Sequence, residues 1–384
     1  MSSNDSTPGA AGRPLRCGAV GVGRMGRHHA RVYAEMDNVE LVGVVDANPE
    51  TAKAIAEKHG CKAFASEREL LEAGVDAVSI AVPTTAHHAS AARFLEAGVA
   101  CLIEKPLAPT AEEAEAIKNI AEKSGACLMV GHIERFNPVM RAMRKAAASE
   151  DDPEGRAISQ KLVPRFIEVH RVSPMTFRSV DIGVVMDMMI HDLDVVLMLM
   201  GGREPDEIQA SGVAIVTEHE DLCNARLTFH LPEGTCVANV TASRLAMKTE
   251  RIARITGENG YIKIDYAAKQ GLIIKRTANE VQMREVREQL RAGKDLTDLN
   301  WQDLVNIEPL MIDGGEPIVM EIEEFLGAVR SGRRPEIDAT AGLVNVRTAE
   351  RIVEAIREFM GATEALPSPE IHVGAGVSRT GAPV

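Results

Sequence analysis

The sequence predicts an α/β protein in two parts, a doubly wound parallel sheet followed by an α+β domain with an open, mainly antiparallel sheet. Up to about residue 131, short apolar runs alternate with helical stretches, which is typical of parallel strands connected by helices. Beyond residue 132, apolar and polar residues alternate with a period of two, which indicates antiparallel strands with one buried face.

A glycine-rich turn, Gly21-Val-Gly23-Arg24-Met25-Gly26, separates the first apolar run from a helical pattern. Gly21 allows the sharp turn, and Gly23 lets a pyrophosphate approach the bare backbone. Gly26 lets the helix pack close to the strand, and the helix N-terminus offers free N–H groups to the phosphates. The turn therefore predicts a Rossmann domain in which Gly21, Gly23, Arg24, Met25 and Gly26 bind a dinucleotide.

Asp46 ends the second apolar run and lies 20 residues after Gly26. A carboxylate at this distance accepts hydrogen bonds from the adenine-side ribose of a dinucleotide. It also repels a 2′-phosphate, so NAD is favoured over NADP as the cofactor. The alternative is a glycine turn without a ligand, in which Asp46 caps the helix that follows Asn48-Pro49.

The apolar runs of the first part predict strands at 17–22, 41–45, 61–64, 76–82, 100–103 and 126–131. The stretches between them predict helices at 24–36, 49–58, 67–73, 86–97 and 110–124, the last begun by a capping box of Thr110 and Glu113. In the second part we expect strands over 162–172, 226–231 and 235–243, an apolar helix over 184–200, and a hairpin of 252–256 and 261–266 that turns at Asn259-Gly260. Residues 277–315 are charged and predicted to be irregular, and helices return at 317–331 and 340–361.

These elements predict four segments: a disordered tail over 1–14, the Rossmann domain over 15–132, a second domain over 133–361 and a flexible tail over 362–384. An acidic loop is expected at Glu150–Gly155, and the last helix can pack back on the first domain.

Lys105 follows the fifth apolar run, in Glu104-Lys105-Pro106. Ligands of an open α/β sheet bind at the carboxyl ends of its strands, so Lys105 is expected near the reactive ring of the dinucleotide. There it can give and take the proton of a carbonyl–alcohol pair. The alternative is an exposed lysine at a strand end. The proline restricts the lysine backbone and can form a cis peptide bond.

Three polar residues, Asp187, His191 and Asp194, share one face of the expected apolar helix, and Asp192 lies off that face. A buried polar stripe is costly unless it is paired or lines a wet site. Its acids and imidazole could relay protons and orient a sugar hydroxyl. The alternative is an internal hydrogen-bonded network that fixes the packing of the helix.

The segment after the sixth strand carries His132, Arg135 and Asn137 at the expected domain junction, which makes them candidate substrate ligands. A structural role is the alternative for Arg135 and Asn137. Three arginines precede the polar helix and could pair with a substrate phosphate, namely Arg165, Arg171 and Arg178. Solvated surface arginines are the alternative for each of the three.

The composition, with 45% hydrophobic and 26% charged residues, is that of a globular protein. A net charge of −13 argues against nucleic acid or an anionic membrane as the partner. The most apolar segment, 184–200, contains four ionisable residues and is not expected to span a membrane. The six cysteines lack metal-ligand spacing and the N-terminus lacks an apolar signal core, so we expect a cytoplasmic protein without a bound metal.

The ordered set of motifs resembles the Gfo/Idh/MocA oxidoreductase family over about residues 15–361. The set consists of the glycine turn, Asp46, Val82-Pro83-Thr84-Thr-Ala-His87, Glu104-Lys105-Pro106 and Asp187-x3-His191-x2-Asp194. The resemblance implies Lys105 as the catalytic lysine with Asp187 and His191 as partners, and either Lys105 or His191 as the main proton carrier. It also implies that Pro83, Thr84 and His87 lie beside the nicotinamide with Glu104 and Lys105, although many members have Asn where this chain has Thr84.

The resemblance further implies NAD(P)-dependent chemistry on sugars, inositols or nucleotide sugars, and a homodimer or homotetramer formed through the open C-terminal sheet. Residues 131–138 and 178–192 look most like members that oxidise the 3-hydroxyl of UDP-N-acetylglucosamine to a ketone. We therefore expect a UDP-N-acetylhexosamine to contact His132, Arg135, Asn137, Arg178, Asp187 and His191. Two alternatives stay open: a dehydrogenase of a free sugar or inositol, and a non-catalytic NAD-binding sensor.

Overall fold

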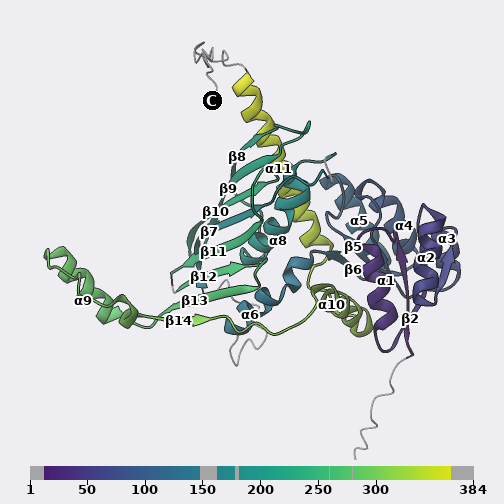
Figure 1. Ribbon diagram of the computed structural model, residues 1–384, viewed down its shortest axis with the longest axis horizontal. Helices are drawn as coiled ribbons and strands as arrows, with labels where there is room; N and C mark the ends of the chain where they lie inside the picture. Colours follow the sequence, from purple (N-terminus) through teal and green to yellow (C-terminus); the bar gives the residue numbers. More distant parts are fainter. Residues whose placement is uncertain (1–12, 148–161, 178–180, 259, 279, 365–384) are drawn as a thin grey trace, which may run out of the picture.

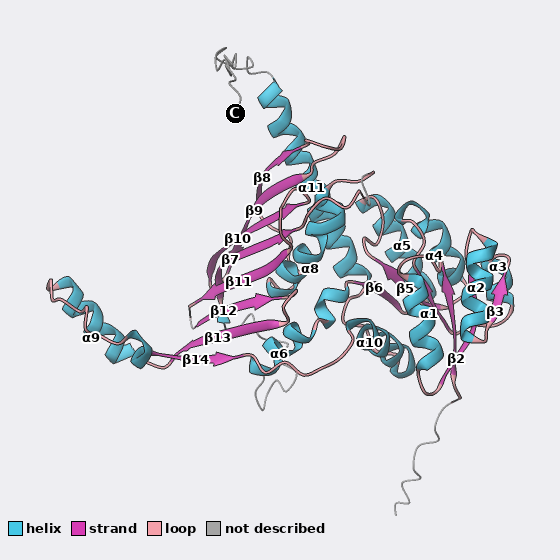
Figure 2. Cartoon of the chain, viewed as in Figure 1, coloured by secondary structure: helices cyan, strands magenta, loops and turns pink. Residues whose placement is uncertain are grey.

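The computed structural model describes residues 13–147, 162–177, 181–258, 260–278 and 280–364 of the chain. Within these residues the chain forms two sheets, one with six strands and one with eight, which lie beside each other with helices between and around them (Figures 1 and 2). The acidic loop and most of both tails named above lie outside the described residues.

The first domain is a parallel sheet with the strand order β3-β2-β1-β4-β5-β6, the doubly wound order expected from the alternating pattern. Its strands are β1 (Leu15–Val20), β2 (Val39–Val45), β3 (Lys62–Phe64), β4 (Ala77–Ile80), β5 (Ala100–Glu104) and β6 (Leu128–Gly131). The connecting helices are α1 (Gly26–Glu35), α2 (Pro49–His59), α3 (Glu67–Glu72), α4 (His87–Glu96) and α5 (Ala111–Ser124). Short 3-10 turns, η1 (Thr84–Ala86) and η2 (Ile133–Phe136), follow β4 and β6.

Local caps fix where two of these helices begin. The Thr110 side chain accepts from the Glu113 N–H at 3.2 Å, which is half of the expected capping box of α5. Asn48, followed by Pro49, caps α2 by accepting from the Glu50 N–H at 3.0 Å. The alternative prediction that Asp46 caps this helix is therefore wrong, because Asn48 occupies that position.

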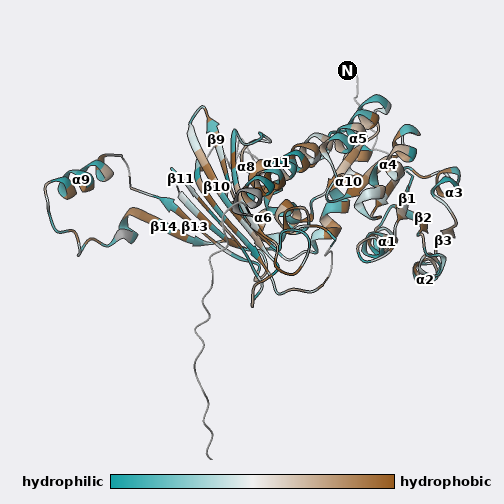
Figure 3. Ribbon diagram, turned by 90° about the horizontal axis from the view of Figure 1, so that it is seen from above, coloured by the Kyte–Doolittle hydropathy of each residue, from teal (hydrophilic) through white to brown (hydrophobic). Residues whose placement is uncertain are grey.

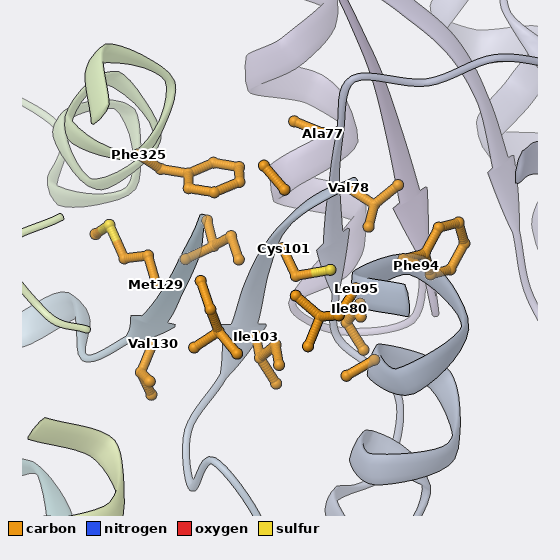
Figure 4. Packing of buried hydrophobic residues seen from close by; sticks show 14 of the residues in the cluster. Ala77, Val78, Ile80, Phe94, Leu95, Cys101, Ile103, Met129, Val130 and Phe325 are labelled. Atoms are coloured by element: carbon orange, nitrogen blue, oxygen red, sulfur yellow. The ribbon is translucent and has the colours of Figure 1, made fainter. Parts of the chain in front are cut away.

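The core of the first domain lies between the parallel strands and their helices, where Val78, Ile80, Cys101 and Ile103 belong to one apolar cluster with Phe94 and Leu95 of α4 (Figure 4). The same cluster includes Phe325 of α10 (Pro317–Ser331). The late helix α10 therefore contributes to the core of the N-terminal domain and closes it on the β6 side.

The second sheet has the order β14-β13-β12-β11-β7-β10-β9-β8 and is antiparallel apart from the parallel pair of β7 and β10. Its strands are β7 (Pro164–Val172), β8 (Glu207–Val213), β9 (Leu222–Leu231), β10 (Gly234–Ser243), β11 (Glu250–Gly257), β12 (Gly260–Asp265), β13 (Gln270–Arg276) and β14 (Val305–Pro309). One face packs on the helices α6 (Pro138–Ala147), α8 (Ile190–Leu199) and α11 (Ala339–Glu364) in a second apolar core. The sequence pattern does not predict α6, β8 or β13.

The 26-residue helix α11 contacts β8 and α8 of the second domain as well as α5 and β6 of the first (Figure 1). It therefore ties the two domains together. Across the described residues, no helix combines the length and the apolar character that crossing a bilayer requires.

Between β13 and β14 the chain leaves the body and forms α9 (Glu280–Arg291) and the turn η4 (Trp301–Leu304). We call residues 280–304 the arm. Figures 1 and 3 show α9 standing away from both domains, and Val281 and Leu290 are 61% and 58% exposed. The prediction that 277–315 is irregular is wrong for α9 and β14.

Candidate active site

The three glycines of the turn between β1 and α1 have the surroundings that a phosphate-binding turn requires. Gly21 has a φ of +77°, and a Cβ there would lie 2.8 Å from the backbone of Ala81. A Cβ on Gly26 would clash with the carbonyl oxygen of Gly21. A Cβ on Gly23 would meet nothing within 4 Å, so its backbone is open to a ligand. These residues fit a dinucleotide pyrophosphate.

Asp46 ends β2 directly beside this turn. Its carboxylate accepts from the Val22 N–H at 2.8 Å and from the Asn48 N–H at 2.9 Å. These contacts fix the carboxylate at the carboxyl edge of the sheet, where a ribose would bind.

A hollow of about 400 Å³ lies between the glycine turn and α2. It is lined by Val22, Gly23, Arg27, Glu50, Thr51, Ala54 and Ile55. The sequence analysis did not predict the α2 residues as part of the dinucleotide site. Their position directly after Asp46 is the feature that could have indicated them.

Lys105 and Asp187 meet across the two domains. The Lys105 ammonium donates to the Asp187 backbone oxygen at 2.9 Å and lies 3.6 Å from its carboxylate. The Lys105–Pro106 peptide bond is cis. Burial lowers the pKa of Lys105 below its usual value, and the negative charges of Asp187 and Glu104 only partly offset this. A lysine in this state is suited to accept a proton.

His87 holds the loops on either side of this lysine. Its ring nitrogens lie 3.0 Å from the Pro106 carbonyl oxygen and 3.1 Å from that of Val82. Because the ring is 1% exposed and engaged with backbone, it shapes the edge beside Pro83 and Thr84. Glu104 likewise faces inward, with its carboxylate 2.9 Å from His29.

Two histidines stand close to Lys105. His191 has a pKa well below its usual value, because burial disfavours the imidazolium and the cations of Lys105 and Arg171 add to that effect. His132 is 1% exposed, and burial lowers its pKa too. Among the described residues, neither Nδ1 atom has a hydrogen-bond partner. Neutral imidazoles beside a buried lysine can exchange protons with a hydroxyl group.

The helix that carries the polar stripe is not a continuous α-helix. Residues Val185–Met189 form a π-helical turn and α8 begins only at Ile190, so the expected i, i+4, i+7 alignment is wrong. Asp187 is on the π turn and His191 is on the first turn of α8. Wider turns of this kind often occur at functional sites.

Asp192 and Asp194 form buried ion pairs instead of facing a ligand. Asp194 accepts two hydrogen bonds from Arg135, at 2.7 and 2.6 Å. Asp192 accepts two from Arg171, at 2.7 and 2.9 Å. For Asp194 the structure supports the alternative of an internal hydrogen-bonded network. The ion pair of Asp192 gives this residue a packing role that the sequence pattern does not indicate.

The neighbouring candidates join the same network. Arg171 also donates to Glu134 at 3.0 Å, and the Asn137 side-chain amide donates to the second oxygen of Glu134 at 3.0 Å. Arg135, Asn137 and Arg171 are each less than 9% exposed. Their polar groups are used within the protein, which corrects the expectation that Arg171 is free for a substrate phosphate.

The other two arginines do not supply a described phosphate ligand. Arg165, at the start of β7, pairs with Glu258, so its guanidinium is engaged within the protein. Arg178 lies outside the described residues. Sequence reasoning missed Arg251, at the start of β11, which is 47% exposed at its side chain and lowers the pKa of His191 through its charge. The sheet register, which pairs it with Arg171, could have found it.

The glycine turn, Asp46 and the lysine at the carboxyl edge define an NAD-binding oxidoreductase. Residues 15–132 match the model of the oxidoreductase family with an NAD-binding Rossmann fold, and residues 169–263 match the GFO/IDH/MocA C-terminal domain. The chain is 37% identical to UDP-N-acetylglucosamine 3-dehydrogenase of Acidithiobacillus ferrooxidans over 329 residues, 85% of this chain and 93% of that protein. The chain therefore belongs to the Gfo/Idh/MocA family of NAD-dependent dehydrogenases.

Solved structures agree with this assignment. The Acidithiobacillus ferrooxidans enzyme superposes with a TM-score of 0.75 at 35% identity, covering 90% of this chain and 98% of that one. The chain is also 34% identical to inositol 2-dehydrogenase of Rhizobium meliloti, over 53% of this chain and 59% of that protein. Levoglucosan dehydrogenase in complex with NADH, at 19% identity and a TM-score of 0.72, shares the fold over 90% of this chain and 97% of its own.

Proposed function

We propose that this protein oxidises the 3-hydroxyl of a UDP-N-acetylhexosamine with NAD⁺ and gives a 3-keto sugar nucleotide. The observation that carries the proposal is the meeting of Lys105 with Asp187, 2.9 Å from ammonium to backbone oxygen, beside His191. The similarity to UDP-N-acetylglucosamine 3-dehydrogenase over 85% of the chain supports the choice of substrate.

In this mechanism, Lys105 in its neutral form takes the proton of the sugar hydroxyl. The Asp187 carboxylate, 3.6 Å away, stabilises the ammonium that forms. His191 stays neutral and orients the hydroxyl, or accepts its proton in place of Lys105. Gly21–Gly26 and Asp46 would hold NAD⁺, which would accept the hydride when bound. General base catalysis of this kind contributes about 10²–10⁴-fold to the rate.

The sugar nucleotide carries a diphosphate that needs a cation. We assign this role to Arg251, because its half-exposed guanidinium lies on the same side of the sheet as Arg171 and within electrostatic reach of His191. Arg178 stays a candidate from the sequence. His132 stays a candidate for the sugar, whereas Arg135 and Asn137 act by holding Asp194 and Glu134 in place.

We further propose that the protein is a homodimer or homotetramer that associates through the outer face of the eight-stranded sheet. A hollow of about 440 Å³ on this sheet is lined by polar residues that include Asn224, Arg226 and Asn239.

All six cysteines are free thiols, which fits the reducing cytoplasm.

The substrate is tested by mixing the purified protein, in stoichiometric amount, with NAD⁺ and one candidate substrate at a time. UDP-N-acetylglucosamine and UDP-N-acetylgalactosamine are compared with myo-inositol and free aldoses, and the absorbance of reduced cofactor is followed. Deuterium at C3 of the reactive UDP-sugar should slow the reaction, whereas deuterium at C4 should not. If the protein oxidised only inositol or an aldose, that compound would replace the UDP-sugar as the proposed substrate. If it bound the cofactor but oxidised none of these compounds, a non-catalytic sensor would be favoured.

A further inference from the structure

Directly behind the strand end that carries Lys105 lies a buried polar cluster that the mechanism does not use. It joins His29 of α1, Glu104 of β5 and Glu321 of α10, and one polar side-chain atom of each lies within 4.8 Å of those of the other two. His29 is 1% and Glu321 is 0% exposed. The cluster continues through Ser79, which lies 3.0 Å from His29 and 2.7 Å from the Tyr33 hydroxyl.

The two carboxyl groups differ sharply in their surroundings. One Glu104 oxygen lies 2.9 Å from His29 Nε2, and the other accepts from the Lys105 N–H at 3.3 Å. Among the described residues, neither oxygen of Glu321 has a hydrogen-bond partner. A buried carboxylate without donors is costly, and two carboxyl groups that share one buried site do not both ionise.

We propose that the pair of Glu104 and Glu321 binds one proton, which is located on Glu321. Glu104 is ionised, so the pair carries a single negative charge behind Lys105. Glu321 is thereby a positioning residue for the reaction proposed above. The electrostatics agree with the geometry. Burial and the charge of Glu104 raise the pKa of Glu321 well above its usual value. For Glu104 the effect of burial is outweighed by His29 and Lys105, which lower its pKa.

The shared proton matters because Glu104 is the direct chain neighbour of Lys105. One negative charge there partly offsets the lowering of the Lys105 pKa by burial. A second charge, on Glu321, would hold the lysine in its ammonium form up to a higher pH and delay its action as a base. The proton on Glu321 therefore helps set the pH at which Lys105 can accept the hydroxyl proton.

Infrared spectroscopy tests the proton without any need for catalysis. At pH 8 exposed carboxyl groups are ionised, so the wild-type protein should show the carbonyl band of a buried, protonated carboxylic acid. The band should disappear in Glu321→Gln and persist in Glu323→Gln, a control on the exposed side of the same helix. Absence of the band from the wild-type protein would overturn the proposal even if the variants did not fold.

Kinetics test the positioning role. In the sugar-oxidation assay, the acid limb of the pH–kcat profile should stay in place in Glu321→Gln, because a neutral amide replaces a neutral acid. It should move to lower pH, by about one unit, in Glu104→Gln, because that variant removes the charge behind Lys105. An equal downward shift in Glu321→Gln would show that Glu321 is ionised and would sink the idea.

A divalent metal is the rival occupant of this cluster, because two carboxylates and an imidazole can ligate one. Metal analysis of the purified protein distinguishes the two. We expect no stoichiometric metal in the wild-type protein, and a metal retained at one per chain and lost in Glu321→Gln would contradict the shared proton. If the protein proved inactive on every sugar, the infrared band would still stand as evidence for the protonated pair, so the two failures are distinguishable.

Discussion

Arg135 and Asp194 lie on different segments, η2 and α8, and are joined by two hydrogen bonds of 2.7 and 2.6 Å in the protein interior. The pair anchors the helix that begins at the π turn, so it fixes where Asp187 and His191 stand relative to Lys105. Its geometry is that of a bidentate arginine–carboxylate contact.

Removing one partner of this pair should destabilise the protein strongly. Asp194→Leu leaves the Arg135 guanidinium buried without its carboxylate, and we expect a loss of about 3–5 kcal/mol in the free energy of unfolding. The double variant Arg135→Met/Asp194→Leu should recover most of it. Urea denaturation measures both, with Arg68→Met, whose side chain is 81% exposed, as a control that changes stability by less than about 1 kcal/mol. If the double variant were as unstable as the single one, the loss of stability would not come from the unpaired Arg135 guanidinium.

Lys105→Met should reduce kcat by about 10²–10⁴-fold with little change in NAD⁺ affinity, because the lysine acts on the substrate proton and the dinucleotide is held by the glycine turn. Stopped-flow reduction of cofactor and fluorescence titration of NADH measure the two quantities. Lys123→Met, an exposed position on α5, is the matched control. Unchanged kcat in Lys105→Met would exclude the lysine from the mechanism.

The pH profile distinguishes Lys105 from His191 as the base. If Lys105 accepts the proton, kcat for oxidation should rise with pH through the pKa of the lysine, which burial places below its usual value of 10.5. If His191 is the base, kcat should already be flat from pH 6.5 upward, because its pKa lies well below 6.5. We expect the rising profile.

Asp46 should determine the preference for NAD over NADP. Its carboxylate is fixed by two backbone N–H groups, so it presents a negative charge where a 2′-phosphate would lie. In Asp46→Asn we expect the ratio of kcat/KM for NAD⁺ to that for NADP⁺ to fall at least about tenfold, roughly 1.4 kcal/mol. Asp37→Asn, at an exposed position before β2, should leave the ratio as it is. An unaltered ratio in Asp46→Asn would place the discrimination elsewhere.

Arg251 should contribute to the affinity for a sugar diphosphate. In Arg251→Gln we expect KM for the UDP-sugar to rise about tenfold with kcat nearly unchanged, because the guanidinium contacts a part of the substrate that does not react. Arg254→Gln removes the same group from the opposite face of β11, where it pairs with Glu168, and should leave KM alone. Equal effects of the two variants would show a general charge effect instead of a contact.

The N-terminal domain could be predicted almost completely from the sequence, because its strands are apolar runs and helices such as α2 and α5 begin at local capping residues, Asn48 and Thr110. The meeting of Lys105 with Asp187 was expected from the family resemblance. The partners of Asp192 and Asp194 could not be predicted, since Arg171 and Arg135 come from distant segments and the choice between them depends on packing.

The π turn also escaped prediction. Nothing in the residues Val185–Met189 marks the extra residue per turn, and an α-helical alignment placed Asp187 and Asp194 on one face. Glu321 escaped because its spacing on α10 is that of an ordinary buried position. For Glu321 the deciding factor is what lies on the neighbouring elements, His29 and Glu104.

The arm gives the fold a place where foreign sequence can be accommodated. Gly293, in the turn after α9, has a φ of +72° and no atom within 4 Å of where a Cβ would be. Both ends of the arm are held by the ladder of β13 and β14, so a peptide tag or a small reporter domain inserted there would be displayed at a distance from Lys105 and the dinucleotide turn.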